Sequence, residues 1–137
     1  MHEDEALATY GLPARADDLP RLRAWLADET RAEATAQGRG DTDVMRLICV
    51  QLFIAGHVTD APLIWAARAA SMDATAAIDL DLTLGAGLAP TLAHLQALDD
   101  PTARRAREAI TAALIAGALE GFDPTETAAR WRRYYMA

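Results

Sequence analysis

The stretch TDVMRLICVQLFIA, residues 42–55, decides the fold of this chain. Arg46 and Gln51 are the only polar residues in its interior, and its apolar residues lie on two faces of a predicted helix. A helix that is apolar on two faces packs between neighbouring elements instead of lying on the surface. We therefore expect a central helix here, ending at Gly56, a residue type that readily adopts the left-handed conformation after a helix.

Capping residues and chain breaks predict further helices on both sides of this one. Asp100 and Asp123 each stand directly before a proline, and an Asp N-cap followed by proline is a common helix start. Alanine, the strongest helix former, accounts for 32 residues of the chain. The predicted helices span residues 18–37, 42–55, 60–71, 73–84, 88–98, 101–119 and 124–137.

These segments predict an all-α fold, a compact domain of about seven helices that pack in orthogonal and antiparallel pairs with stacking of helical hairpins. Residues 42–55 and 60–71, joined by a tight connection with Thr59 as the expected N-cap, form one such antiparallel hairpin. Residues 17–137 are expected to form a single helical domain. Residues 1–16 are expected to be a partly mobile N-terminal lead-in, either extended or a short helix.

Residues 78–84 allow two interpretations. Their sequence, IDLDLTL, alternates strictly between apolar and polar residues, which is typical of a half-buried strand. The chain offers no second predicted strand, and a lone strand leaves its backbone groups without hydrogen bonds. We therefore expect one helix over residues 73–84, and we keep a strand paired with another chain as the alternative.

The composition predicts a globular protein with an acidic surface. The 137 residues suffice for one domain with one core, and 52% of them are hydrophobic. The net charge is −7, and all 13 basic residues are arginine. This charge disfavours binding to nucleic acid or to a membrane, and it favours a protein partner with a basic or mixed-charge surface.

The chain shows no pattern of a targeting or membrane-spanning segment. Residues 2–5 read HEDE and lack the apolar region of a signal peptide. No stretch approaches the ~20 uncharged apolar residues of a transmembrane helix. The single cysteine, Cys49, lies in an apolar run, which predicts a buried and inert thiol. We therefore expect a cytoplasmic protein.

The region between Leu47 and Leu88 resembles a block of uncharacterised bacterial all-helical proteins. The residues that carry this resemblance are Leu63-Ile64-Trp65, Ala70-Ser71, Asp73, Ile78-Asp79 and Gly85-Ala86-Gly87-Leu88. The turn at Gly56, followed by Asp60-Ala61 and Trp65, also resembles, faintly, the hairpins of TPR and HEAT proteins. The resemblance implies a helical fold, and it implies no catalytic residue.

No group of residues has the spacing of a known catalytic, cofactor or metal site. His2, His57 and His94 lie far apart, and neither HExxH nor Glu-x-x-His occurs. Ser71, the only serine, lies outside any GxSxG motif. The segment Gly85–Gly87 lacks the third glycine of a dinucleotide fingerprint and is interpreted as a helix break. We predict no catalytic, cofactor-binding or metal-binding residue, and no cofactor.

Three acidic residues of the predicted helix over residues 73–84 are interpreted structurally. Asp73 is expected to cap a helix, and Asp81 is expected to be solvated. Asp79 lies on a different side of the predicted helix from Asp81 and is expected to be a buried partner of Arg46 or Arg68.

Arginines and aromatic residues are interleaved near the C-terminus. We predict Arg130, Trp131, Arg133, Tyr134 and Tyr135 as a surface for a protein partner, because these residue types dominate the binding energy of many interfaces. In the alternative, Trp131 and Tyr135 pack the last helix against the core, and the arginines face water.

The function that these observations favour is non-catalytic protein binding, as in an adaptor or in a toxin-immunity or antitoxin-like protein. Two alternatives remain open. One is a small helical enzyme or ligand-binding protein with a site near Asp79, Asp81, Gly85–Gly87 and His94. The other is a structural subunit of a homodimer or of a larger assembly.

Overall fold

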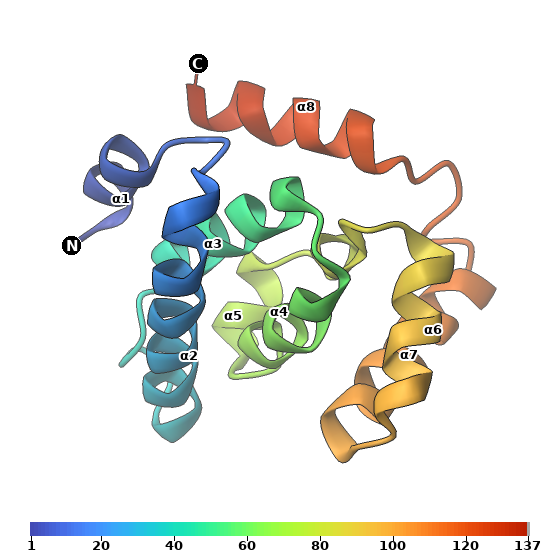
Figure 1. Ribbon diagram of the computed structural model, residues 1–137. Helices are drawn as coiled ribbons and strands as arrows, with labels where there is room; N and C mark the ends of the chain where they lie inside the picture. Colours follow the sequence, from blue (N-terminus) through green and yellow to red (C-terminus); the bar gives the residue numbers. More distant parts are fainter. Residues whose placement is uncertain (137) are drawn as a thin grey trace.

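Helix α3, Thr42–Ala55, lies at the centre of the computed structural model, which describes residues 1–136 (Figure 1). Val44, Met45 and every residue from Leu47 to Phe53 are buried. The Asp41 carboxylate caps the helix by accepting a hydrogen bond from the Val44 N–H at 3.1 Å. Both faces of α3 are covered, so the predicted central helix is confirmed.

Seven further α-helices occur within the described residues. They are α1 Glu3–Tyr10, α2 Leu19–Thr35, α4 Ala61–Arg68, α5 Met72–Ala77, α6 Leu88–Leu98, α7 Pro101–Ile115 and α8 Pro124–Met136. Of these, α1, α2, α5 and α8 contact α3 directly. Three short 3₁₀ segments join them, namely η1 Ala16–Asp18, η2 Val58–Asp60 and η3 Leu80–Leu84. Helices make up 76% of the structure and no strand occurs in the described part of the chain, which confirms the predicted all-α fold.

The apolar side chains form two adjoining cores. The larger core is built around α3 and includes Leu22, Ile48 and Ile78. The smaller core contains Leu95 and Ile110, from the antiparallel pair α6 and α7 seen at one side of Figure 1. Helix α4 packs against α2 on one side and against η3 and α7 on the other, so it joins the two cores.

The predicted helix over residues 73–84 is wrong. Helix α5 ends at Ala77, Ile78 and Asp79 adopt extended conformations, and η3 follows them. Ile78 is fully buried while Asp79 is exposed. Burial of Ile78 in the larger core decides the conformation here. Two extended residues followed by a 3₁₀ segment explain why apolar and polar residues alternate over residues 78–84. The alternative of a strand paired with another chain is therefore not required.

Helix α7 ends four residues before the predicted boundary at residue 119, because Gly117 stops it. Gly117 has φ 79°, and the Ala118 N–H donates to the Ala113 carbonyl oxygen at 3.0 Å. A left-handed glycine together with this bond across the last turn is the Schellman arrangement that ends many helices. The segment between Gly117 and Gly121 therefore forms turns that lead toward α8.

The start of the lead-in is helix α1, in which Ala6 is fully buried. The connection between α3 and α4 differs from its prediction. Thr59 lies inside η2 and does not cap α4. Helix α4 packs mainly against α2, η3 and α7, so its predicted hairpin with α3 is not the main contact.

A buried glutamate orders the connection between α2 and α3. Glu33 is 1% exposed, and its Oε1 accepts hydrogen bonds from the backbone N–H groups of Gly38 at 2.9 Å and Gly40 at 3.0 Å. Its Oε2 accepts a hydrogen bond from the Ser71 hydroxyl at 2.6 Å, which links α2 to the start of α5. Buried charged groups are tolerated when they are hydrogen-bonded in this way.

Replacement of Glu33 by alanine is expected to lower the free energy of unfolding by about 1–3 kcal/mol, because it leaves its buried hydrogen-bond donors without an acceptor. Urea denaturation measures this change. Asp28→Ala is the matched control on the same helix, since Asp28 is exposed and pairs only with Arg31. We expect this control to stay within about 0.5 kcal/mol of the wild type. Equal losses in both variants would contradict the role assigned to Glu33.

The same carboxylate predicts a pH dependence. The Ser71 hydrogen bond lowers the pKa of Glu33 below its ordinary value of 4.5, burial opposes this shift, and the Gly40 and Gly38 amides lower the pKa further. Because the pKa is lower in the folded state, the stabilisation is present above pH 4.5 and is lost as the pH falls through the folded pKa. The free energy of unfolding of the wild type, measured by urea denaturation over a range of pH, is expected to fall in this window. The Glu33→Ala variant is expected to lack this contribution to the fall.

Candidate functional site

Helix α8 crosses the top of the molecule in Figure 1 and is held there by Arg46 of α3. The Nε of Arg46 donates a hydrogen bond to the Tyr135 hydroxyl at 3.2 Å, and its Nη2 donates one to the Tyr134 hydroxyl at 3.2 Å. The Trp131 and Tyr135 rings stack with centroids 6.0 Å apart. Glu3 of α1 lies 3.5 Å from the Arg46 Nη2. The C-terminal half of α8 is therefore fixed against both α3 and α1.

This arrangement divides the five residues that the sequence assigned to a partner surface. Trp131 and Tyr135 are half-buried and pack against the larger core. Arg130, Arg133 and Tyr134 are exposed. Trp131 and Tyr135 thus hold α8 in place together with the hydroxyl of exposed Tyr134, and Arg130, Arg133 and the rest of the Tyr134 side chain remain accessible to a partner.

The predicted buried partnership of Asp79 with Arg46 or Arg68 is wrong. Asp79 is exposed, and it forms no ion pair with either arginine in the described structure. The extended conformation of residues 78–79 turns the Asp79 side chain away from the core. Arg46 is paired with Glu3 and the two tyrosines instead, whereas the half-buried Arg68 has an Nε without a hydrogen-bond partner.

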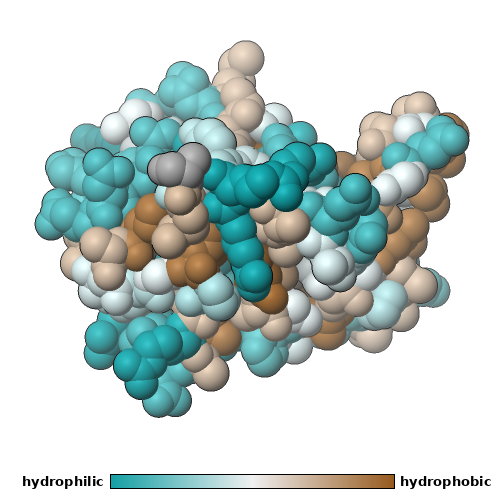
Figure 2. Space-filling view, turned by 90° about the horizontal axis from the view of Figure 1, so that it is seen from above, coloured by the Kyte–Doolittle hydropathy of each residue, from teal (hydrophilic) through white to brown (hydrophobic). Residues whose placement is uncertain are grey.

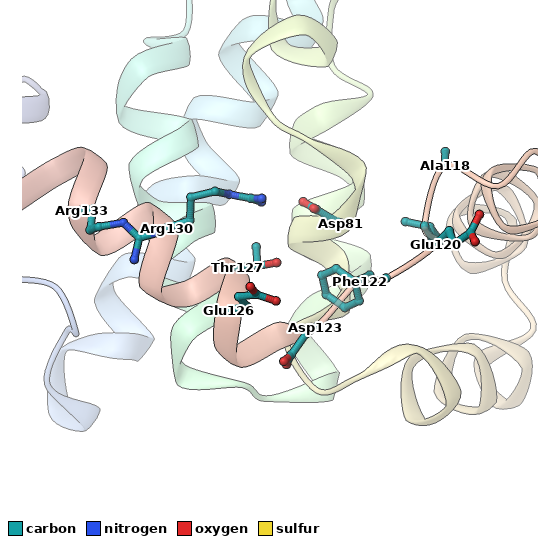
Figure 3. A pocket seen from close by; sticks show the side chains of 11 residues that line it. Asp81, Ala118, Glu120, Phe122, Asp123, Glu126, Thr127, Arg130 and Arg133 are labelled. Carbon is teal, nitrogen blue, oxygen red and sulfur yellow. The ribbon is translucent and has the colours of Figure 1, made fainter.

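A polar cavity of about 270 Å³ opens beside the N-terminal half of α8. Asp81 of η3, Phe122 of the connection between α7 and α8, and Arg130 of α8 are among its walls (Figure 3). Figure 3 shows the Arg130 guanidinium group and the Asp81 carboxylate pointing toward each other across it. We call this space the Asp81 cavity.

Asp81 is the unusual carboxylate of this cavity. Its Oδ1 is buried and has no hydrogen-bond partner within the described residues. Burial raises the pKa of Asp81 above its ordinary value of 3.8, the Asp79 carboxylate raises it further, and the Arg130 guanidinium opposes both. The prediction that Asp81 is solvated therefore holds for only part of its side chain, because η3 turns one oxygen inward.

A second hollow, a groove of about 560 Å³, lies on the other side of α8. Phe53, Gly85, Pro124 and Ala128 contribute to its walls. A Cβ on residue 85 would lie 2.5 Å from the Phe53 carbonyl oxygen, so only glycine fits at this contact. The segment Gly85–Gly87 thus serves close packing and the start of α6.

The residues of the alternative site predicted from the sequence are separated in space. Asp81 lines the cavity, and Gly85 lines the groove. His94 lies on α6 and lines neither of these two hollows. The structure therefore keeps Asp81 as a candidate and brings it together with Phe122, Thr127 and Arg130, which the sequence did not connect with it.

The end of α7 exposes apolar side chains close to the Asp81 cavity. Ile115 is 83% exposed and Leu114 is 45% exposed, and residues 118–122 form part of the cavity wall. Seen from above in Figure 2, hydrophobic residues cover much of the arm that projects at the upper right, where α7 ends in Figure 1. The stretch AALIAGAL, residues 112–119, contains no polar residue, so a helix or turn formed by it has no polar side to face water. This pattern is visible in the sequence and indicates an exposed apolar surface.

The chemistry of the cavity suits the binding of charged groups. Its lining contains carboxylates, guanidinium groups and one threonine, and it contains no serine, cysteine or histidine. The Asp81 carboxylate and the Arg130 guanidinium group, which point toward each other across the cavity, offer charged groups to an occupant.

Neither a metal cluster nor a spanning helix is found in the part of the chain that the structure describes. No three side chains of His, Cys, Asp or Glu lie close enough within residues 1–136 to hold one metal ion. None of the described helices has both the length and the apolar character needed to cross a bilayer. Comparison with protein families, curated proteins and solved structures gives no match.

The anchoring of α8 predicts unequal effects of two neighbouring tyrosines. Tyr135→Phe is expected to lower the free energy of unfolding by about 1 kcal/mol, because it removes the half-buried acceptor of the Arg46 Nε. Tyr134→Phe removes a hydroxyl from a side chain that is 58% exposed, and it is expected to cost less than about 0.5 kcal/mol. Thermal and urea denaturation of both variants provide the comparison. A larger loss from Tyr134→Phe would refute this account.

The burial of Asp81 predicts that its negative charge lowers the free energy of unfolding at neutral pH. Because its pKa is higher in the folded than in the unfolded state, its contribution to stability falls as the pH rises from the ordinary value of 3.8 through the folded pKa. Asp81→Asn removes the charge and is expected to keep or raise the free energy of unfolding at neutral pH, which chemical denaturation measures. A clear loss of stability would mean that Asp81 is a structural ion-pair partner.

Proposed function

We propose that this protein binds another protein of basic or mixed surface charge through the end of α7 and the adjoining side of α8. The observation that carries the proposal is the exposure of Ile115, 83% accessible in a stretch without polar residues. Exposed apolar side chains that are contiguous with one another mark contact sites more often than isolated ones do. Leu114, at 45% exposure, and the exposed Ala112, Ala116 and Ala118 make this stretch contiguous.

The surroundings of Ile115 support an interface. The neighbouring wall of the Asp81 cavity carries exposed Glu120, and the facing side of α8 carries exposed Arg130 and Arg133. An apolar centre beside a charged rim is the usual arrangement of protein–protein contacts. We call Leu114, Ile115, Glu120, Arg130 and Arg133 the α7–α8 surface.

The overall charge argues for a different protein as the occupant. Two copies of a chain of net charge −7 repel each other. The α7–α8 surface itself carries both signs of charge, which suits a partner of basic or mixed charge better than a uniformly acidic one. An adaptor and a toxin-neutralising protein both fit this description, and the identity of the partner distinguishes them.

Two equally exposed apolar residues allow a matched test. Ile115 on α7 and Met72 on α5 are each 83% exposed. Wild-type protein, Ile115→Glu and Met72→Glu serve as baits in native lysate, and proteins retained by the wild type are identified, purified and measured by calorimetry. A partner that binds through the α7–α8 surface is expected to lose at least about tenfold in affinity with Ile115→Glu, as at interface hot spots. Met72→Glu is expected to bind it like the wild type.

Two results would contradict the proposal. One is a purified partner that binds Ile115→Glu as tightly as it binds the wild type. The other is a wild-type dimer in light scattering that Ile115→Glu converts to monomer while Met72→Glu does not, because the occupant would then be a second copy of the chain.

A further inference from the structure

The groove of about 560 Å³ beside α8, which we call the α8 groove, has only positively charged residues in its lining. These are Arg132 and Arg133, and both are exposed. Neither lies within ion-pair distance of a carboxylate in the part of the chain that the structure describes, whereas four other arginines do. The α8 groove therefore offers two uncompensated guanidinium groups to an anion.

This local charge is opposite to the charge of the whole chain. The net charge is −7, yet six of the 13 arginines and only four of the 20 acidic residues follow residue 100. Glu126, the acidic residue of α8, lines the Asp81 cavity and does not line the α8 groove. Positive and negative side chains are thus separated on the two sides of α8, and the groove side is the one that attracts an anion.

The walls of the α8 groove next to the arginines are mostly apolar. Ile54 of α3 and Pro124, Ala128 and Ala129 of α8 line it, and all four are half-buried, so each keeps part of its apolar surface in water. Arg132 follows Ala128 by four residues and Ala129 by three, a spacing that places all three on one side of a helix. An apolar wall thus leads directly to a positive end, and a complementary ligand has an aliphatic part and an anionic end.

We propose that the α8 groove binds a free medium-chain aliphatic carboxylate, with its chain against the apolar wall and its carboxylate at Arg132 and Arg133. The planar guanidinium group donates two parallel hydrogen bonds to a carboxylate. Contact of the aliphatic chain with Ile54, Ala128 and Ala129 removes apolar surface of both partners from water. The groove volume of about 560 Å³ lies within the range of about 300–1,000 Å³ that is typical of small-molecule sites.

Two other occupants match the α8 groove less well. A phosphate monoester carries nearly two negative charges at neutral pH, and the net charge of −7 opposes a dianion more strongly than a monoanion. A protein partner is proposed for the α7–α8 surface, which adjoins the Asp81 cavity and shares only Arg133 with the groove. Carboxylate binding in the groove therefore does not depend on the proposed function.

Titration of the ¹⁵N-labelled full chain with sodium octanoate, below its micellar concentration and at low ionic strength, tests the inference. We expect saturable amide shifts at Ile54, Gly85 and Ala129, which line the groove. Octylammonium has the same chain with the opposite charge and is expected to give no saturable shift. Butanoate keeps the carboxylate but covers less of the apolar wall, so it is expected to bind at least about tenfold more weakly.

Four results of these titrations would overturn the inference. They are the absence of a saturable shift with octanoate, binding of octylammonium as tight as that of octanoate, binding of butanoate as tight as that of octanoate, and binding of octyl phosphate tighter than that of octanoate. The last result would assign the groove to a phosphate ligand.

Three variants test the residues. Arg132→Gln is expected to weaken octanoate binding about threefold, as for an exposed ion pair. Ala129→Leu keeps a strong helix former but fills part of the groove, and it is expected to abolish binding. Arg39→Gln is the matched control, because Arg39 is also exposed and belongs to the connection between α2 and α3, which Figure 1 shows well away from α8. Equal weakening by Arg132→Gln and Arg39→Gln, or unchanged binding by Ala129→Leu, contradicts the inference.

The Ile115→Glu variant separates this inference from the proposed function, and it is expected to bind octanoate like the wild type. Octanoate binding without an Ile115-dependent partner overturns only the proposed function. An Ile115-dependent partner without octanoate binding overturns only the present inference. If that partner is also lost with Arg132→Gln, the groove belongs to the protein interface instead of a carboxylate site.

Discussion

Helix α3 imposes the constraint on which the rest of the structure depends, because both of its faces must be removed from water. The continuous burial of residues 47–53 leaves α3 without a solvent-facing stripe along most of its length. Helices α1, α2, α5 and α8 therefore lie around it, and η3 approaches so closely that Gly85 contacts the Phe53 backbone. Hydrophobic burial fixes the arrangement, while Arg46, a partly accessible residue of α3, supplies the polar anchor for the last helix.

The buried carboxylates differ in whether their oxygens have hydrogen-bond partners. Glu33 has three donors, and Asp60 receives two hydrogen bonds from Arg23, at 2.7 and 3.1 Å. These carboxylates hold neighbouring segments together at little cost, since their charge is compensated. The Asp81 Oδ1 is the carboxylate oxygen among the described buried atoms that lacks such compensation.

Two features that ordinarily lower stability, an exposed aliphatic side chain and a buried oxygen without a hydrogen bond, occur on neighbouring segments. Ile115 exposes an aliphatic side chain to water, and Asp81 buries an oxygen without a partner. The turns between α7 and α8 connect them, because residues 118–123 line the cavity and follow the exposed end of α7. Sequences that otherwise agree with their fold break such rules mainly where function requires it. This coincidence places the proposed α7–α8 surface and the Asp81 cavity on one side of the molecule.

The sequence by itself determined the helical class, the central helix and the helix starts at Asp100 and Asp123, because periodicity and capping act between residues close in the chain. Only the tertiary structure decided the break at residues 78–79, the exposure of Asp79 and the meeting of Asp81 with Arg130. These depend on which core receives each side chain, and burial against distant residues overrides local pattern there. The candidate site could not be read from spacing, since its residues come from η3, a connecting turn and α8, which only folding brings together.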